Sequence, residues 1–392
     1  MRILYHHRTR ATDAQRVHIL EIVNAFEALG HQVEMAALAS TESGGQDAAR
    51  DAEVPAWQRL VRRVPLAYEL AQIGYNLVGL ALVLKRLLWG KFDFIYERYS
   101  LFNFAGVLAA RLSRKPIILE VNSPLALELG REKAIRAVGL ANWTERVICN
   151  LATKVIVVSG PLRRIMLENG VNESKLVLMP NGVNLEHLGA AHHDGGLRRS
   201  LGLEGRVAVG FVGWFKKWHG LEFLLEAFGG SRLGDLGAAL LLIGDGPAMP
   251  DLKRYVETNG LGNSVVFTGA VPHERIPPYL GLIDIAVQPA ANEYCCPMKI
   301  IEYMGLGKPI VAPRQENIAE LLGDGSEALL FEPGDKRSLA GALRALITDR
   351  EERRRLGEGA LAAVHERGLL WTANARRIVD LAAASRRSAT EP

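Results

Sequence analysis

Cysteine is scarce in this sequence. Three cysteines occur among 392 residues, at Cys149, Cys295 and Cys296. They are too few for a disulfide framework, and no metal-ligand spacing includes them. We therefore expect a reducing compartment and no structural metal centre.

Long hydrophobic runs and targeting signals are also missing. The apolar centre of the most hydrophobic stretch, residues 73–84, is about half as long as a segment that crosses a bilayer. Glu69 and Asn76 interrupt it, and the opening MRILYHH reads as a strand without a signal-peptide core. The sequence therefore predicts that this stretch does not span a membrane.

The same stretch allows two interpretations. Basic residues flank it, as in a helix lying in a lipid interface; they are Arg59, Arg62, Arg63, Lys85, Arg86 and Lys91. Alternatively, it is a long helix packed on its own domain with solvated basic ends.

No strong excess of one charge sign is present. Residues 1–185 carry 23 Lys and Arg against 17 Asp and Glu, or +6, whereas the remainder carries 24 against 26, or −2. The excess is too scattered for a nucleic-acid footprint. The basic half is the one expected to face an anionic surface.

Strand and helix signals alternate along the whole chain, which is too long for one core. Such alternation predicts an α/β fold of two doubly wound parallel-sheet domains. The pattern lapses over 186–205, which we interpret as a linker between an N-terminal domain, 1–185, and a C-terminal domain, 206–370. Residues 371–392 form a last amphipathic helix and tail, and we expect the helix to pack back on the N-terminal domain.

A dinucleotide fingerprint is absent after the first strand, where RTRATDAQR lacks the G-x-G-x-x-G turn. The later LLLIGDGPAM is a partial match, but no acidic residue follows at the required distance. We interpret Gly244 and Gly246 as turn glycines, and a dehydrogenase is disfavoured.

The stretch from 285 to 313 predicts a strand, a polar loop, a short helix from Pro297 and a further strand. The helix N-terminus then faces the carboxyl end of the sheet, where ligands of such folds bind. The amides of Met298, Lys299 and Ile300 would point at an anion such as a diphosphate.

Glu302 lies one turn deeper in this helix. Its carboxylate can accept hydrogen bonds from two sugar hydroxyls. The alternative is that Lys299 and Glu302 form a surface ion pair.

Strand 207–212 runs into Gly213 and the loop WFKKWHG. A glycine-bounded turn with two lysines and a histidine predicts a diphosphate clamp. A solvated basic turn would have the same composition.

Several blocks occur in a recognisable order: VSGPLRRIMLENGV, KLVLMPNGVN, GFVGWFKKWHGLEFLLEAF, LLIGDGP, VVFTGAVPHERIPPYL, DIAVQP, the 299–312 stretch and LLFEPGD. Together they resemble the family 4 glycosyltransferases of the GT-B fold. The resemblance covers the second domain almost wholly and the first more loosely. It implies two Rossmann-like domains facing across a cleft, and sugar transfer from a nucleotide donor with retention and without a metal or other cofactor. No D-x-D pair for a divalent cation is present.

The resemblance also implies which residues act. The nucleobase would lie near Thr268 to Val271, the ribose on Glu302, and the diphosphate on the loop and helix just described. Implied catalytic residues are Lys217, Lys216 and Glu302; implied donor-binding residues are Gly213, His219, Thr268, Val271, Glu293, Met298, Lys299, Ile300 and Glu302.

Two departures from the family pattern stand out. Trp214 and His219 occupy positions where the family usually has arginine and lysine, so the basic role passes to Lys216 or Lys217, and the choice stays open. The family's paired glutamates stand eight apart, but eight residues before Glu302 is Tyr294, with Glu293 one place off.

In the first domain, the sequence EVNSP stands where family members often carry a histidine near the acceptor. Glu120 or Asn122 therefore occupies that position and is a candidate for acceptor binding. A neutral Asn cannot act as a general base. In retaining transfer of this kind, the departing phosphate is usually drawn as the group that takes the proton. His18, near the first loop, is a further candidate for acceptor binding.

These features predict a cytoplasmic glycosyltransferase, peripheral at the inner face of the membrane, that transfers sugar to a glycan or lipid-linked acceptor in envelope or exopolysaccharide synthesis. The alternatives are a sugar-nucleotide-binding subunit without catalysis and a nucleotide-sugar epimerase of the same fold. The sequence does not distinguish UDP, GDP and ADP donors.

Overall fold

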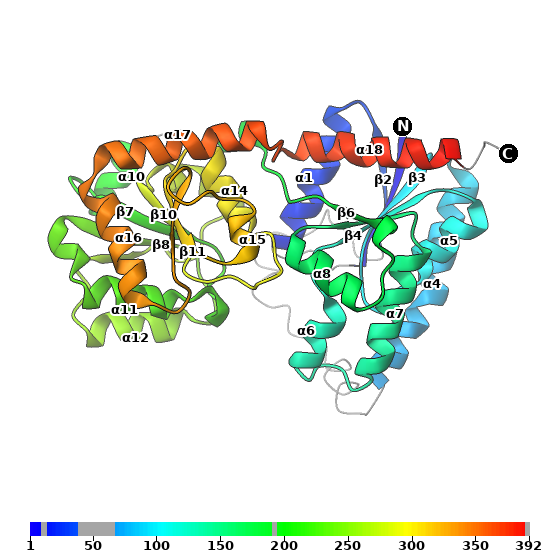
Figure 1. Ribbon diagram of the computed structural model, residues 1–392, viewed down its shortest axis with the longest axis horizontal. Coiled ribbons are helices and arrows are strands. Elements are labelled where there is room, and N and C mark those ends of the chain that lie inside the picture. The colour runs from blue at the N-terminus through cyan, green and yellow to red at the C-terminus, as the bar shows by residue number, and fades with distance from the viewer. Residues whose placement is uncertain (9–13, 38–66, 190–193, 389–392) are drawn as a thin grey trace. The chain divides into compact units, whose positions relative to one another are not determined.

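The computed structural model describes residues 1–8, 14–37, 67–189 and 194–388. The chain forms two compact units, each with its own sheet (Figure 1). Unit 1 contains Met1–Pro180 together with Trp371–Pro392, and unit 2 contains Asn181–Leu370. Arg59, Arg62 and Arg63 lie outside the described residues.

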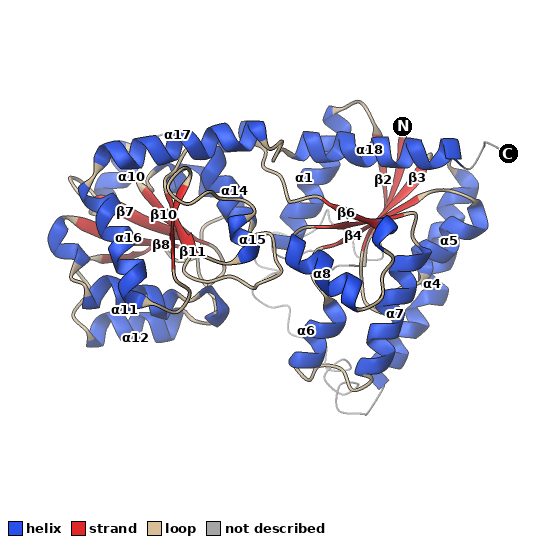
Figure 2. Cartoon of the chain, in the orientation of Figure 1, coloured by secondary structure: helices blue, strands red, loops and turns tan. Residues whose placement is uncertain are grey.

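Unit 1 is built on a six-stranded sheet of order β2-β1-β3-β4-β5-β6 (Figure 2). All of its strand pairs are parallel. The strands are β1 (Arg2–His6), β2 (Gln32–Ala36), β3 (Phe94–Arg98), β4 (Ile117–Val121), β5 (Lys154–Val157) and β6 (Leu176–Leu178). The chain direction across the sheet reverses between β1 and β3, which is the position where open α/β sheets bind ligands.

Helices cover both faces of this sheet. The C-terminal helix α18 packs on α1, and α4 packs on α5. The helices of unit 1 are α1 (Ala14–Ala28), α4 (Ala67–Trp89), α5 (Ala105–Ser113), α6 (Leu125–Arg131), α7 (Val138–Leu151), α8 (Gly160–Glu168) and α18 (Trp371–Ser388). The last residues of the chain therefore complete the domain that its first residues begin.

Helix α4 is longer than the apolar centre seen in the sequence. In the described part of the chain it is the one helix long and apolar enough, by length and composition, to cross a membrane, over Glu69–Trp89 with a mean hydropathy of 1.2. The prediction that this stretch is too short to span is therefore not supported by its length. The helix continues past Glu69 and Asn76 because unit 1 gives both side chains partners. Glu69 accepts from the Arg136 amide at 2.7 Å, and Asn76 donates to the Phe102 carbonyl at 2.8 Å.

Unit 2 has a second all-parallel sheet of order β12-β11-β10-β7-β8-β9. Its strands are β7 (Val207–Val212), β8 (Ala238–Ile243), β9 (Val265–Phe267), β10 (Ile285–Val287), β11 (Ile310–Pro313) and β12 (Ala328–Phe331). This is the classic doubly wound order, and the reversal falls between β7 and β10. The loops that follow these two strands are therefore the expected ligand-binding loops.

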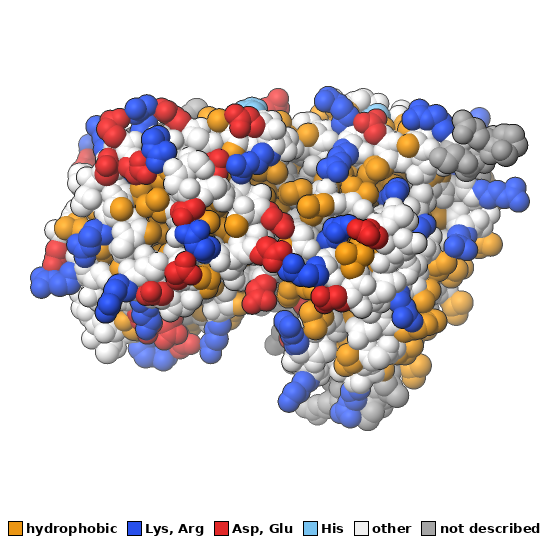
Figure 3. Space-filling view, viewed as in Figure 1, with side chains coloured by type: hydrophobic (Ala, Val, Ile, Leu, Met, Phe, Trp, Pro, Cys, Tyr) orange, Lys and Arg blue, Asp and Glu red, His pale blue; other side chains and the backbone are white. Residues whose placement is uncertain are grey.

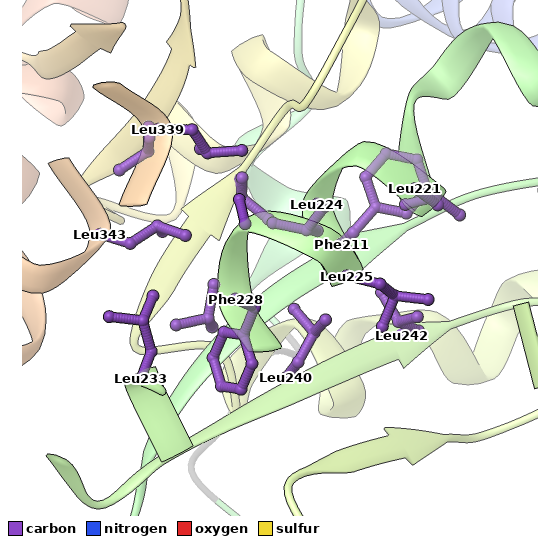
Figure 4. Close-up of a cluster of buried hydrophobic side chains, with 14 of the residues drawn as sticks. Phe211, Leu221, Leu224, Leu225, Phe228, Leu233, Leu240, Leu242, Leu339 and Leu343 are labelled. Carbon is purple, nitrogen blue, oxygen red and sulfur yellow. The ribbon is translucent and has the colours of Figure 1, made fainter. Parts of the chain in front are cut away.

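The core of unit 2 lies between the sheet and helices α11 (Leu221–Gly230) and α16 (Lys336–Thr348). Figure 4 shows leucines of α11 near Leu240 and Leu242 of β8, with Leu339 and Leu343 of α16 in the same cluster but away from these two residues. Phe211 and Phe228, both 1% exposed or less, fill the same layer. Burial of side chains of this size stabilises the fold by about 1.5 to 3 kcal/mol each.

The remaining helices of unit 2 are α9 (Leu185–Leu188), α10 (Gly195–Ser200), α12 (Met249–Thr258), α13 (Ile276–Gly281), α14 (Met298–Gly305), α15 (Glu316–Ala319) and α17 (Arg350–Glu366). Helices α9 and α10 occupy much of the region interpreted as a linker. Arg198 of α10 donates to the Asp284 carboxylate at 2.7 Å, which ties this segment to unit 2. The chain passes from unit 1 to unit 2 earlier, at Pro180.

Candidate active site

Two loops meet at the reversal point of the second sheet. The first, residues 213–220, follows β7, and the second, residues 288–297, follows β10. A side chain at Gly220 would lie 3.0 Å from the Ala290 Cβ, so the loops are in close contact. This close contact favours glycine at 220, as does the backbone φ of 70° there.

The first loop is fixed on the neighbouring turn after β8. The Phe215 amide donates to the Asp245 carbonyl at 2.7 Å, and the Phe215 carbonyl accepts from the Ala248 amide at 3.0 Å. A side chain at Gly246, with φ of 155°, would lie 2.4 Å from the Phe215 nitrogen. Gly244 and Gly246 thus serve close backbone packing, as expected of turn glycines.

Lys299, from helix α14, brings a cation to the point where the two loops meet. Its Nζ lies 3.2 Å from His219 Nε2 and 4.4 Å from the centre of the Phe211 ring. The same Nζ would lie 3.2 Å from a Cβ at Gly213, whose φ of 147° favours glycine. The ammonium therefore sits directly beside the strand glycine.

Burial and nearby charge set the protonation of this pair. Burial, followed by the Lys299 and Lys216 cations, lowers the pKa of His219 to about 3, so its imidazole is neutral. Burial lowers the pKa of Lys299 to about 8, against the opposing effect of the Glu302 carboxylate. A neutral imidazole can accept from the lysine, which remains mostly charged at neutral pH.

Helix α14 begins one residue later than expected. Pro297 is its N-cap, and the Ile300 amide donates to the Pro297 carbonyl at 3.1 Å. The prediction that the Ile300 amide is free to bind an anion is therefore wrong, because the tight first turn consumes it. The Met298 and Lys299 amides precede that first internal bond and keep the N-terminal position that favours an anion.

Glu302 lies one turn further along α14, partly exposed and close enough to raise the pKa of Lys299. Its neighbour Tyr303 is fully buried and accepts from the Val212 amide at 3.1 Å. This bond fixes α14 against the end of β7. Both Lys299 and Glu302 are thereby carried by a helix anchored in the core.

Lys216 and Lys217 occupy a different place from Lys299. Both are exposed, and both line a groove of about 400 Å³ that runs along α12, with Glu222 and Tyr255 among the other lining residues. The backbone of Lys216 stays near the site, since its amide nitrogen lies 3.3 Å from His219 Nδ1. The structure thus joins Lys299, rather than these two side chains, to His219.

The other predicted donor residues are distributed around the same edge. The Thr268 hydroxyl accepts from the Gly244 amide at 3.1 Å and donates to the Gly269 carbonyl at 2.9 Å. Val271 is partly buried after β9, and Glu293 is exposed on the second loop. Thr268 therefore ties neighbouring turns together through its side chain.

Two amide side chains hold the second loop. Gln315 donates to the Ala291 carbonyl at 3.2 Å, and Asn317 donates to the carbonyls of Asn292 and Cys295 at 3.0 and 2.7 Å. These bonds come from the segment after β11. The loop is therefore fixed from the neighbouring strand.

In unit 1, two predicted acceptor residues form one buried cluster. His18 Nε2 lies 3.2 Å from the Glu120 carboxylate, and His18 Nδ1 lies 3.1 Å from Arg98. Trp371 of α18 covers the His18 ring at 4.7 Å. His18 and Glu120 are 2% and 4% exposed.

Asn122, two residues beyond Glu120, is partly buried, and its side-chain nitrogen has no hydrogen-bond partner in the described part of unit 1. On the opposite face of the sheet, His6 Nδ1 lies 3.3 Å from the Glu97 carboxylate, which also accepts from Asn103 at 2.8 Å. These groups lie at the reversal point between β1 and β3. Across the described residues, no group of three His, Cys, Asp or Glu side chains could hold a metal ion.

Sequence reasoning did not single out Arg98 or the pairing of Lys299 with His219. Arg98 is the last residue of β3 and lies beside the reversal point. In the sequence, the Y-E-R triplet at the end of a strand was the feature that could have pointed to it. Lys299 and His219 are 80 residues apart, and only the strand order brings them together.

Comparison with known proteins agrees with this architecture. Residues 15–187 match the family model described as Glycosyltransferase Family 4, and residues 206–349 match the model described as Glycosyl transferases group 1. An alpha-D-kanosaminyltransferase of Streptomyces kanamyceticus is 26% identical over 262 residues, which are 66% of this chain and 68% of the relative. A phosphatidyl-myo-inositol mannosyltransferase of Mycobacterium leprae is 27% identical over 380 residues, 92% of this chain and 90% of the relative.

Among solved structures, Anabaena HepE in complex with UDP superimposes with a TM-score of 0.72 at 19% identity, covering 98% of this chain and 100% of HepE. At this identity the likeness establishes the fold. The two family models together account for most of both units. The chain therefore belongs to glycosyltransferase family 4 and has the GT-B fold.

Proposed function

We propose that this glycosyltransferase transfers a sugar from a nucleoside-diphosphate donor, with retention and without a metal ion or other cofactor. The observation that carries the proposal is the Lys299 ammonium, fixed by His219 beside Gly213 at the N-terminus of α14. A fixed cation, a bare glycine backbone and a helix N-terminus together suit a diphosphate. HepE, which shares the fold, was crystallised with UDP and with UDP-glucose.

In this proposal the Lys299 ammonium provides the electrostatic stabilisation of the reaction. Negative charge develops on the departing diphosphate as the bond to the sugar breaks. Lys299 and the Met298 and Lys299 amides stabilise that charge where it forms. The diphosphate then takes the proton of the acceptor hydroxyl, so no separate base is required.

Glu302 completes the donor site by accepting hydrogen bonds from the donor ribose. Its carboxylate lies deeper along α14 than the phosphate-facing amides. Thr268 to Val271 would lie against the base. Glu302→Ala should weaken donor binding by about 1 to 3 kcal/mol, whereas a donor analogue lacking ribose hydroxyls should bind this variant and wild type equally.

We further propose that the acceptor is a glycan or lipid-linked sugar of envelope or exopolysaccharide synthesis, and that the protein acts on the cytoplasmic face of the membrane. An apolar surface supports this. It consists of side chains on α4 and α5 that are at least 36% exposed: Leu70, Ile73, Leu77, Val78, Leu88, Trp89, Leu108 and Leu112. Figure 3 shows hydrophobic side chains gathered over these helices. The name of the M. leprae relative describes action on a phosphatidylinositol lipid.

The geometry of α4 favours a position in the lipid interface. Its exposed apolar residues recur at helical spacing along one side. Tyr75 and Asn76 face unit 1, where Arg8 lies 3.9 Å over the Tyr75 ring and the Phe104 amide donates to Asn76 at 2.5 Å. A spanning position would break these contacts, whereas an interfacial position keeps them.

Calorimetric titration with UDP, GDP and ADP tests the donor site. Lys299→Met removes a charge-assisted contact worth about 1.5 to 3 kcal/mol, so we expect at least a tenfold loss of affinity for the preferred nucleotide. The double variant Lys216→Ala, Lys217→Ala is the matched control and should bind within about threefold of wild type. A loss in the control with normal binding by Lys299→Met would move the diphosphate to the exposed lysines.

A further inference from the structure

Two tryptophans are exposed in the loop after β7. Trp214 is 54% exposed and Trp218 is 46% exposed, although Phe215 between them is fully buried. Tryptophan is normally well buried in a folded domain. Two half-exposed indoles in one short loop, at the ligand-binding edge of a sheet, mark a recognition surface.

The backbone that presents these indoles is rigid. Phe215 is held on both sides by hydrogen bonds to Asp245 and Ala248, and its ring packs 6.1 Å from that of Phe211. Both indoles are exposed on this fixed segment of backbone. They are therefore presented to solvent before any ligand binds, which lowers the entropy cost of binding.

Each indole borders the proposed diphosphate position. Trp214 directly follows Gly213, beside which the Lys299 ammonium lies. The Trp218 ring lies 3.8 Å from the His219 ring, and His219 Nε2 lies 3.2 Å from the Lys299 ammonium. Both indoles therefore belong to the loop that carries the proposed diphosphate contacts.

The chemistry of indole restricts what can bind there. The electron-rich face of the indole ring does not attract a diphosphate, but it packs well against a flat apolar face that carries partial positive charge. The C–H face of a pyranose ring is such a surface. The two lysines between the indoles, Lys216 and Lys217, have exposed side chains that can donate to sugar hydroxyls.

We propose that Trp214 and Trp218 form an aromatic platform that binds a pyranose ring of the acceptor. The proposal rests on the proposed function, which already gives the parts of the donor other partners: the phosphates on Lys299 and α14, the ribose on Glu302 and the base near Thr268. Because Lys299 supplies the cation from α14, position 214 needs no charged side chain. The platform then selects acceptors by the apolar face of their ring.

The test uses simple saccharides, methyl pyranosides and disaccharides, with UDP present at saturation. Binding is followed by saturation-transfer NMR and by intrinsic tryptophan fluorescence. Trp214→Ala or Trp218→Ala should weaken saccharide binding about tenfold, and the corresponding Phe variants should recover part of it. Trp143→Ala removes an indole that is 48% exposed on α7 in unit 1, and it should bind saccharides as wild type does.

Calorimetry with UDP and with UDP-glucose identifies any other occupant. The alanine variants should bind both nucleotides within about twofold of wild type. Weaker binding of UDP would show that the indoles stack on the base, and weaker binding of UDP-glucose alone would show that they hold the donor sugar. Either result overturns the platform, as does failure of every saccharide to bind wild type. If wild type binds saccharides through the indoles but binds no nucleotide, the platform stands and the proposed donor site fails.

Discussion

At the scale of single residues, the Lys299 side chain is held in place by contacts with its neighbours. It is partly buried, its Nζ lies 3.2 Å from Nε2 of the neutral His219, and it lies 4.4 Å from the centre of the Phe211 ring. These neighbours lower its pKa to about 8 because burial disfavours the charged form. A bound diphosphate would raise the pKa of Lys299 again, because a nearby negative charge favours the charged form.

We therefore expect UDP affinity to depend on pH through Lys299. The anion favours the charged lysine, so affinity is full below pH 8 and falls as pH rises through the pKa of the free protein, by up to about tenfold per pH unit. Titrations between roughly pH 7 and 9.5 avoid protonation of the phosphate, whose pKa is about 6.

The matched variant is Lys299→Arg, because guanidinium stays charged throughout this range. Its UDP affinity should be flat where that of wild type falls. A parallel decline in both proteins would assign the pH dependence to another group.

At the scale of elements, helix α4 carries two different surfaces. One side is apolar and exposed, with Leu77 at 79% and Leu88 at 83%. The other side caps helix α5, since Asn76 bonds both the Phe102 carbonyl and the Phe104 amide at its start. One side of the helix therefore belongs to the fold, and the other side leaves apolar side chains exposed.

Replacement of Leu70, Leu77 and Leu88 by Ser should reduce sedimentation with anionic vesicles at least tenfold, because a leucine moved out of water contributes up to about 1.5 to 3 kcal/mol. The melting temperature should change little, since these side chains are exposed. Val83→Ser, at a fully buried position of the same helix, is the contrasting control and should lower the melting temperature instead. Unchanged vesicle binding by the triple variant would remove the lipid assignment.

The elements themselves were largely readable from the sequence, because strands and helices alternate with clear hydrophobic periods. Pro297 also predicted the α14 N-terminus to within one residue. What could not be read were contacts that depend on strand order. From the sequence, the diphosphate clamp was assigned to Lys216 or Lys217, because no local sequence pattern shows that Lys299 lies beside His219. It also read Asn76 as an interruption of an apolar run, because its partners, Phe102 and Phe104, come from another element.

At the scale of the whole molecule, each unit has its own core and sheet, and α18 belongs to unit 1. Trp371, 4% exposed, packs on His18, and Arg386 at the other end of α18 bonds Asp93. Stability of unit 1 therefore depends on the end of the chain. We expect two thermal transitions in calorimetry, one for each core.

Trp371→Ala should lower the transition of unit 1 alone, because loss of a buried tryptophan costs about 3 to 5 kcal/mol. UDP should raise the other transition, by the stabilisation that any ligand gives the state it binds. A single transition that responds to both changes would show that the two units unfold together.

The placement of α18 also has a consequence for biosynthesis. Unit 2 is one uninterrupted segment, whereas unit 1 needs both ends of the chain. At roughly 5 to 20 residues per second, the ribosome takes on the order of 10 to 40 seconds to make residues 181–370. During that interval the face of unit 1 that α18 later covers, including His18, remains exposed. The nascent chain thus completes its second domain before its first, and the first is the one that a chaperone would have to shield.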